Sequence, residues 1–238
     1  MRRFLPVLVF GISFGILEAI VVIYLRQIYY PDGFQFPLVF LTPEMIAVEI
    51  VREFCTIVML GVIGWICGKR LIQKFSFFIF TFGVWDIFYY LALKIFLDWP
   101  ESLFTWDVLF LIPVTWIGPV LAPVICSFGM IIISLISVYL DENISVLRLT
   151  LSEKLIIITG VLIILYTFIY DYGRIIIENG FLSQLFTLAD NEEFWNIITN
   201  YIPQHFNWLL FALGCLTIAI SYGLAFWRVL RESNKNIK

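Results

Sequence analysis

The amino-acid sequence predicts an all-α integral membrane protein with six transmembrane helices in a single domain that covers residues 1–238. The chain is 61% hydrophobic and only 14% charged, whereas soluble domains are about 45–50% apolar and about 25% charged. A soluble chain of this length has too little interior to hide so much apolar surface. This composition excludes a soluble globular protein and a disordered chain. The net charge of −3 also gives no reason to expect nucleic acid as a partner.

Six apolar segments are each long enough to cross a bilayer. They cover residues 4–28, 43–68, 75–97, 113–140, 155–178 and 203–228. The first segment follows two arginines, as in a signal peptide, but it contains Glu18 and lacks a small-residue cleavage site. We therefore expect it to be retained as a transmembrane helix.

Basic residues occur in alternate loops and predict the orientation of the helices. These residues are Arg2, Arg3, Lys69, Arg70, Lys74, Arg148, Lys154, Arg228, Arg231, Lys235 and Lys238. Both termini are therefore expected on the cytoplasmic side of a multi-pass protein. Two crossings within residues 104–140 would place the later basic residues outside. We expect one crossing, preceded by an outer interfacial segment that contains Trp106 and Asp107.

The longest outer loop, residues 179–204, contains a short amphipathic pattern. Its apolar residues at helical spacing are Phe194, Trp195, Ile197, Ile198, Tyr201 and Ile202. Asp190 and Glu193 resemble a capping pair at the start of this pattern. We expect a short helix over about 190–202 that lies flat in the outer membrane interface, although an ordinary surface helix would carry the same residues.

Two stretches of the chain resemble each other. FGILEAIVVIYLR (residues 14–26) and FGVWDIFYYLALK (residues 82–94) share a Phe-Gly pair, an acid and a base at equal offsets. Downstream, VFLTP ends at Pro43 and LFLIP ends at Pro113. This similarity leads to the hypothesis that helices 1–2 and 3–4 are tandem copies of one hairpin that run parallel in the membrane.

Charged residues inside the apolar segments carry the functional prediction. Each of two acids lies eight residues before a basic residue that we expect at the outer interface, Arg26 or Lys94, which is about 12 Å along a helix. Two further acids lie about 9 and 15 Å below the outer start of the second helix. These four carboxylates form one depth band, called here the acidic band: Glu18, Asp86, Glu49 and Glu53.

Arg52 shares one face of the second helix with Glu49 and Glu53, at i+3 and i+4 spacing. One arginine as internal counter-ion cannot neutralise four acids. Ionisable groups at this depth face the bundle interior and pair with each other, with a cation or with protons. We therefore interpret the acidic band as a binding site for a small cation or protons. Three further polar residues are candidates to assist binding at this site: Tyr90, His205 and Asp107. The alternative is an ion-pair network that only fixes helix packing.

Other chemistry has little support in the sequence. The cysteines Cys55, Cys67, Cys126 and Cys215 lie in apolar runs without a CxxC pair, and we expect isolated reduced thiols. A single histidine, His205, excludes a three-histidine metal site. Walker A, HExxH, GxSxG and Rossmann motifs are missing. We expect no cofactor, with a divalent cation on the carboxylates left open.

The stretch GVWDIFYY…DWPESLFTWDVLFLIPVTWIGPVLAP, over about residues 83–123, resembles a run found in small, uncharacterised polytopic membrane proteins of bacteria. The resemblance implies a protein of the bacterial inner membrane. It implies no activity.

Three functions remain open. We favour a proton- or cation-coupled transporter of a small solute or ion, with the acidic band open to the outer side and a fourth helix broken at Pro119 and Pro123 as its moving element. The second is a membrane-embedded enzyme on a lipid-linked or periplasmic substrate, which uses the acids with a metal or as acid and base. The third is a non-catalytic membrane subunit or assembly factor. Besides the lipid bilayer, a second copy of the chain or a membrane partner subunit is an open partner.

Overall fold

The computed structural model describes residues 2–112, 114–184, 187–188 and 191–235. In chain order, the elements are α1 (Phe4–Tyr29), α2 (Pro43–Cys67), α3 (Leu71–Leu97), β1 (Trp106–Phe110), β2 (Trp116–Pro119), α4 (Leu121–Asn143), α5 (Leu151–Glu178), η1 (Phe181–Gln184), α6 (Glu192–Ile198) and α7 (Trp208–Lys235). Helices dominate the described part of the chain, as predicted.

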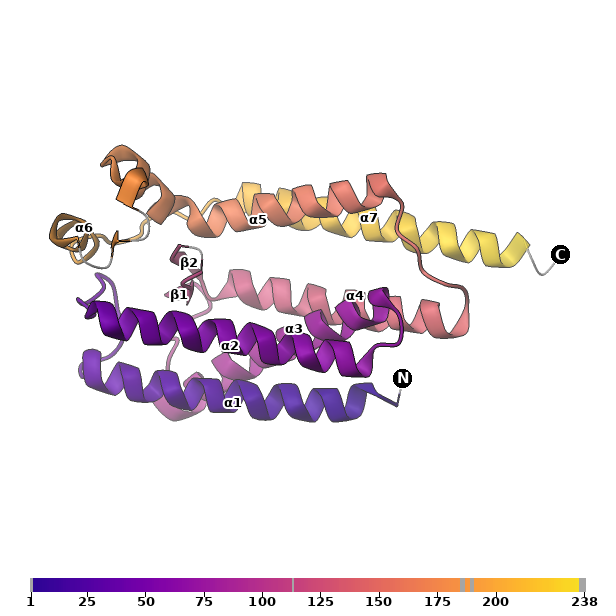
Figure 1. The fold of residues 1–238 in the computed structure, drawn as a ribbon, viewed down its shortest axis with the longest axis horizontal. Helices are drawn as coiled ribbons and strands as arrows, with labels where there is room; N and C mark the ends of the chain where they lie inside the picture. Colours follow the sequence, from indigo (N-terminus) through magenta and orange to yellow (C-terminus); the bar gives the residue numbers. More distant parts are fainter. Residues whose placement is uncertain (1, 113, 185–186, 189–190, 236–238) are drawn as a thin grey trace.

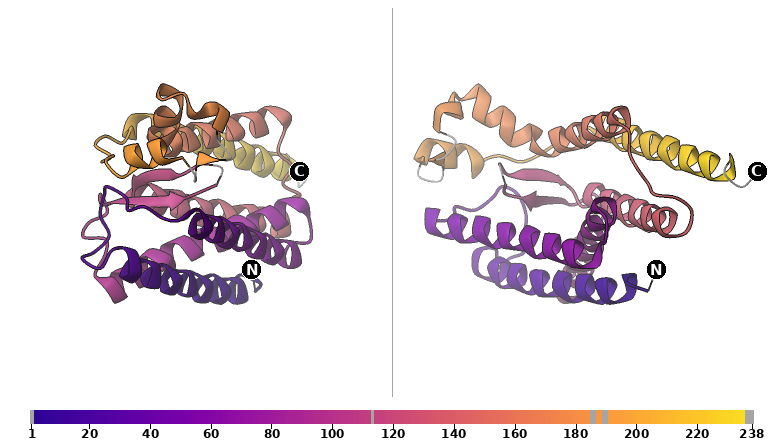
Figure 2. Two further views of the ribbon diagram at one scale, coloured as in Figure 1. Left: turned by 60° about the vertical axis from the view of Figure 1, so that its left-hand side comes forward. Right: turned by 45° about the vertical axis from the view of Figure 1, so that its right-hand side comes forward.

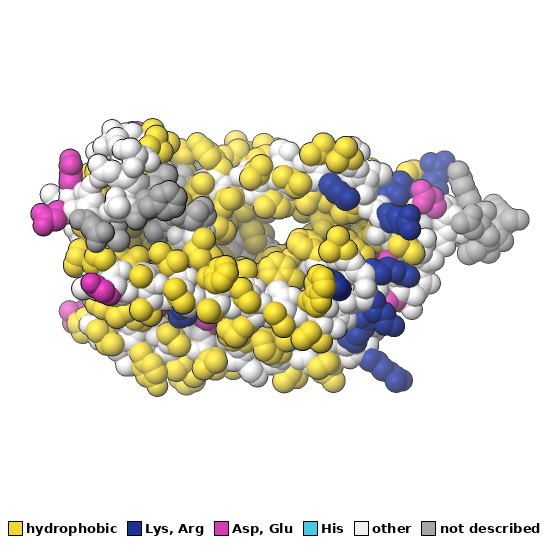
Figure 3. All heavy atoms as spheres, in the orientation of Figure 1, with side chains coloured by type: hydrophobic (Ala, Val, Ile, Leu, Met, Phe, Trp, Pro, Cys, Tyr) yellow, Lys and Arg dark blue, Asp and Glu magenta, His cyan; other side chains and the backbone are white. Residues whose placement is uncertain are grey.

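Five of these helices are long and apolar enough to cross a membrane: α1, α3, α4, α5 and residues Trp208–Ser233 of α7. The protein is therefore a multi-pass membrane protein, and apolar side chains cover much of the face shown in Figure 3. The helix α2 is not among the five in the described chain. It carries charged side chains in its first half, including Glu49 and Arg52. The predicted count of six crossings is not confirmed.

The helices form two groups that lie one above the other in Figures 1 and 2. In the first group, α1, α2 and α4 pack along α3, which is the most buried of the candidate spans. In the second group, α5 packs along α7. The β1–β2 hairpin lies between the two groups, at the end of the molecule where α1, α3 and α5 finish. At this end of the molecule, segments from both helix groups therefore lie around the hairpin.

Small residues allow the closest helix contacts. A Cβ atom at Gly15 would collide with the backbone carbonyl oxygen of Trp85, so α1 can approach α3 only because this side chain is absent. Where α5 meets α7, a Cβ at Gly160 would lie 2.8 Å from the carbonyl oxygen of Gly214. Such close approaches are typical of helices packed in membranes.

The prediction that a helix begins at residue 113 is wrong, and α4 begins at Leu121. The preceding residues form an antiparallel hairpin in which Trp106 pairs with Pro119. Proline has no N–H group and restricts the residue before it, and the aromatic and β-branched residues nearby favour strands. Pro119 ends β2, and Pro123 lies in the first turn of α4, where its missing N–H has no helical partner to lose. These prolines do not break a transmembrane helix, so they do not supply the predicted moving element.

The tandem hairpin repeat is not confirmed. The helices α1 and α3 run parallel and pack together, but the second halves of the two hairpins differ. Pro43 is the first residue of α2, whereas β1 and β2 separate α3 from α4, and Pro113 lies outside the described residues. The packing within the two hairpins also differs. In the second hairpin α4 packs along its own partner α3, whereas in the first α2 packs mainly on α3 and much less on its own partner α1.

The helix α6 is shorter than the predicted helix over 190–202. Asn191 caps it by accepting a hydrogen bond from the N–H of Phe194 (2.9 Å), and Asp190 of the predicted capping pair lies outside the described residues. Phe194 and Ile198 are buried in a cluster with residues of α5 and β2. One side of α6 therefore packs on the protein, and its predicted position in the membrane interface stays a prediction.

Two of the four free cysteines are neighbours, which the sequence does not reveal. The thiols of Cys126 on α4 and Cys215 on α7 are within hydrogen-bonding reach of each other, next to Phe168 and Phe211. The expectation of isolated thiols is therefore wrong for this pair. The two thiols mark a place where the two helix groups meet.

Candidate functional site: a buried acidic cavity

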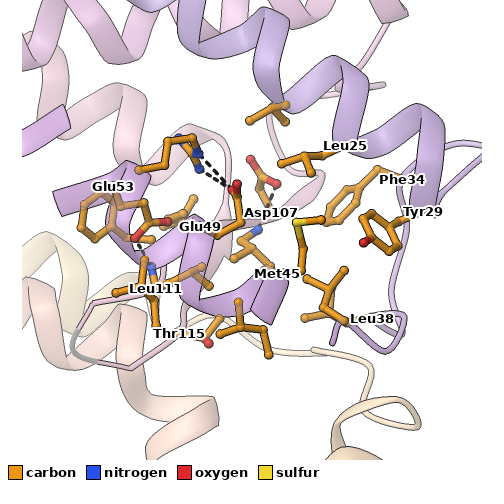
Figure 4. A pocket seen from close by; sticks show the side chains of 18 of the residues that line it. Leu25, Tyr29, Phe34, Leu38, Met45, Glu49, Glu53, Asp107, Leu111 and Thr115 are labelled. Carbon is orange, nitrogen blue, oxygen red and sulfur yellow. Dashed lines mark hydrogen bonds and ion pairs between the residues drawn. The ribbon is translucent and has the colours of Figure 1, made fainter. Parts of the chain in front are cut away.

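A cavity of about 460 Å³ lies at the end of the molecule where α1 and α3 finish and α2 begins. Its walls come from these three helices, from the loop between α1 and α2, from the hairpin and from parts of α5 and α6. Figure 4 shows side chains from several of these segments around it. Small-molecule sites in proteins have volumes of about 300–1,000 Å³. The cavity therefore has room for a small organic molecule as well as for an ion.

Five carboxylates line this cavity: Glu18 from α1, Glu49 and Glu53 from α2, Asp86 from α3, and Asp107 from β1. All five residues are buried. The structure thus brings the four residues of the acidic band to one cavity and adds Asp107.

Arg52 binds two of these acids. Its Nε and Nη2 atoms donate to Glu49 Oε2 at 3.0 and 2.8 Å, and its Nη1 forms an ion pair with Glu18 Oε1. Glu18 also accepts a hydrogen bond from Thr56 Oγ1 at 3.2 Å. Arg52 therefore links its own helix, α2, to α1 through the ion pair with Glu18.

A second arginine lines the cavity, which sequence reasoning missed. Arg26 was expected to extend into the outer interface, but it is 7% exposed, and its Nη2 donates to Asp107 Oδ1 at 2.9 Å. Asp107, expected at the interface, is 1% exposed and also accepts from Tyr90 Oη at 3.2 Å. The Arg26 guanidinium lies 3.7 Å from the ring centroid of Trp99. The sequence contained one indication of this pair: Arg26 and Asp107 carry opposite charges, and both lie among aromatic residues.

The other two acids have no such partner. Glu53 Oε2 accepts a hydrogen bond from the backbone N–H of Leu111 at 2.8 Å, and Asp86 Oδ2 accepts one from Ser127 Oγ at 2.8 Å. Glu53 is 7% exposed and Asp86 is 8% exposed. Among the described residues, neither carboxylate forms an ion pair with a lysine or arginine. With five acids and two arginines on its wall, the cavity has three more acidic groups than basic ones.

Of the other polar residues that were candidates to assist binding, some line the cavity and one does not. Tyr90 lines the cavity and donates to Asp107. His205 is exposed in the irregular segment before α7 and does not line the cavity. The last helix begins at Trp208 and not at residue 203, because Asn207 caps it by accepting from the N–H of Leu210 (3.0 Å).

The loop between α1 and α2 covers part of the cavity. In this loop, Tyr30 lines the wall and accepts a hydrogen bond from the N–H of Val39 at 3.0 Å. Burial raises the pKa of the Tyr30 hydroxyl above its ordinary value because the charged phenolate loses its hydration. Tyr30 therefore stays neutral and acts as a hydrogen-bonding part of the wall.

The carboxylates do not form a ready metal centre. Within the described ranges, no group of three or more His, Cys, Asp or Glu side chains is placed to hold a metal ion. Ca²⁺ and Mg²⁺ take six or more oxygen ligands.

No protein-family model, curated protein or solved structure matches this chain.

Proposed function

We propose that this protein is a transporter of the inner (cytoplasmic) membrane that moves a small solute or ion in a process coupled to protons or another cation. The observation that supports this proposal is the burial of Glu53 and Asp86 on the wall of the cavity, where neither forms an ion pair among the described residues. An ionised carboxylate that is buried outside an ion pair is costly. Each acid therefore takes up a proton or binds a cation, and a coupled transporter needs a site that gains and loses such a charge.

The distribution of surface charge supports an orientation with the cavity towards the outer side. Lysine and arginine side chains gather at the end of the molecule where the chain termini lie (Figures 1 and 3), and the cavity lies near the opposite end. Basic residues favour the cytoplasmic side. In this orientation α2 is the sixth crossing, because its 25 residues extend about 37 Å at 1.5 Å per residue.

This orientation predicts which loops are accessible from outside. In a cysteine-free background, a single cysteine at position 102, in the exposed segment after α3, is expected to react with a membrane-impermeant thiol reagent applied to intact cells. A cysteine at position 145, exposed after α4, is expected to react only after permeabilisation. Labelling of position 145 in intact cells would contradict both the orientation and the sixth crossing.

The transport proposal is tested by cation flux into proteoliposomes that contain the purified protein. With an imposed membrane potential, we expect uptake of H⁺ or Na⁺ that depends on the protein, and a loss of about tenfold or more in Glu53→Gln, because the charge that binds the cation is removed. A pH-sensitive dye inside the vesicles and ²²Na⁺ uptake measure the two fluxes.

Glu44→Gln is the matched control, since Glu44 lies on the same helix but is exposed and does not line the cavity. This variant should retain the flux of the parent. Equal flux in parent, Glu53→Gln and empty vesicles for both ions would refute coupling through this site.

A further inference from the structure

Aromatic rings form much of the cavity wall beside the unpaired acids. Trp85 and Tyr89 both line the cavity and stack on each other, with ring centroids 6.1 Å apart and an interplanar angle of 18°. Asp86 follows Trp85 on the same helix, and Phe34 contributes another ring from the loop between α1 and α2. The faces of aromatic rings carry negative charge density and attract cations, most strongly where water is excluded.

The protein already holds one organic cation against this wall. The guanidinium carbon of Arg26 lies 4.3 Å from the ring centroid of Phe34, which lines the cavity, and 3.7 Å from that of Trp99, which lies behind the lining. Asp107 neutralises the charge of Arg26 at 2.9 Å. Arg26 therefore shows the combination that stabilises a planar organic cation here: a buried carboxylate together with aromatic faces.

Glu53 and Asp86 supply the same two elements, a carboxylate and nearby rings, elsewhere on the wall. Each is a buried carboxylate on the cavity wall, and the rings of Trp85 and Tyr89 lie on the same wall. The cavity volume of about 460 Å³ is in the range of sites for small organic molecules. Among the described side chains no cluster suits a dehydrated metal ion. The two carboxylates outside ion pairs, the rings and the volume together favour an organic cation.

We infer that the solute bound by this cavity is a small organic ammonium compound, whose positive charge is balanced by Glu53 and Asp86 and whose alkyl groups contact the aromatic wall. This inference rests on the proposed transport function and names the class of its substrate. The carboxylates balance the charge while the ring faces contact the ammonium group. An alkali ion with a tight hydration shell gains less from such ring contacts.

The experiment compares ligands on the unmodified full-length protein in detergent. The probes are choline, its uncharged isostere 3,3-dimethyl-1-butanol, and NaCl at equal ionic strength. We expect choline to bind about tenfold or more tightly than the isostere, measured by isothermal titration calorimetry. Equal binding of choline and the isostere, or binding of neither at millimolar concentration, would overturn the inference.

Variants then assign the site. Glu53→Gln and Asp86→Asn are each expected to weaken choline binding by about tenfold or more, and Trp85→Phe is expected to weaken it less than Trp85→Leu because phenylalanine keeps a ring face. Glu44→Gln should bind as the parent does. A melting curve of each variant comes first, and the comparison of ligands on the parent stands even where a variant fails to fold. Unchanged binding in folded Glu53→Gln and Asp86→Asn would place the ligand elsewhere and refute the assignment.

The experiments distinguish failure of the transport proposal from failure of the organic-cation inference. Protein-dependent flux of H⁺ or Na⁺ that requires Glu53, without binding of choline, would overturn the organic-cation inference and leave the transport function standing. Choline binding that requires Glu53, without flux of H⁺, Na⁺ or choline into proteoliposomes, would support the assigned ligand class and refute transport.

Discussion

Replacing Arg52 by glutamine is expected to lower the free energy of unfolding by about 3–5 kcal/mol, because it breaks a buried ion-pair network, and protonation of Glu18 and Glu49 does not restore the hydrogen bonds that the guanidinium donated. Arg52 holds both Glu18 and Glu49, so two carboxylates on neighbouring helices lose their partner together. The loss is measured by reversible unfolding in mixed detergent micelles with increasing SDS, supported by a thermal melt.

Glu53→Gln is the matched comparison, one position along the same helix. The ion pairs of Arg52 do not involve Glu53, and a glutamine oxygen can still accept the hydrogen bond from the N–H of Leu111. We expect a change within about 1 kcal/mol. A loss as large as that of Arg52→Gln would mean that Glu53 belongs to a structural ion-pair network, and the cation-site interpretation would fail. Glu49→Gln is not equivalent to Glu53→Gln here, because Glu49 is a partner of Arg52.

Asp107→Asn is expected to lower the free energy of unfolding by about 3–5 kcal/mol, because it leaves the buried guanidinium of Arg26 without a counter-ion and arginine cannot shed its proton. Arg26→Gln should cost less. Burial already raises the pKa of the Asp107 carboxyl, so without Arg26 this group takes up a proton and avoids an unpaired charge.

A double-mutant cycle with the same unfolding measurement tests this coupling. The double variant Arg26→Gln/Asp107→Asn should lose less than the sum of the single losses, since neither charge is left alone. Strictly additive losses, or a larger loss in Arg26→Gln than in Asp107→Asn, would contradict the pairing of these two residues across the cavity wall.

Several features of this protein follow from the sequence alone. Long apolar runs predict membrane helices because a bilayer core accepts only segments that satisfy their own backbone, and α1, α3 and α5 start and end within four residues of the predicted bounds. Local counting along the helices also predicts that the four residues of the acidic band lie close together, because each helical residue advances by 1.5 Å. The structure brings Glu18, Glu49, Glu53 and Asp86 to one cavity.

Only the tertiary structure decided which charges pair. Glu49 and Glu53 both lie beside Arg52 in the sequence, yet Arg52 pairs with Glu49 and with Glu18 of α1, while Glu53 turns to the backbone of the segment after β1. Arg26 and Asp107 meet across 81 positions of the chain. Helical spacing determines which residues share a face, whereas the helix opposite that face depends on how the whole chain packs. For the same reason the hairpin before α4, which supplies Asp107 to the cavity, could be found only in the folded protein.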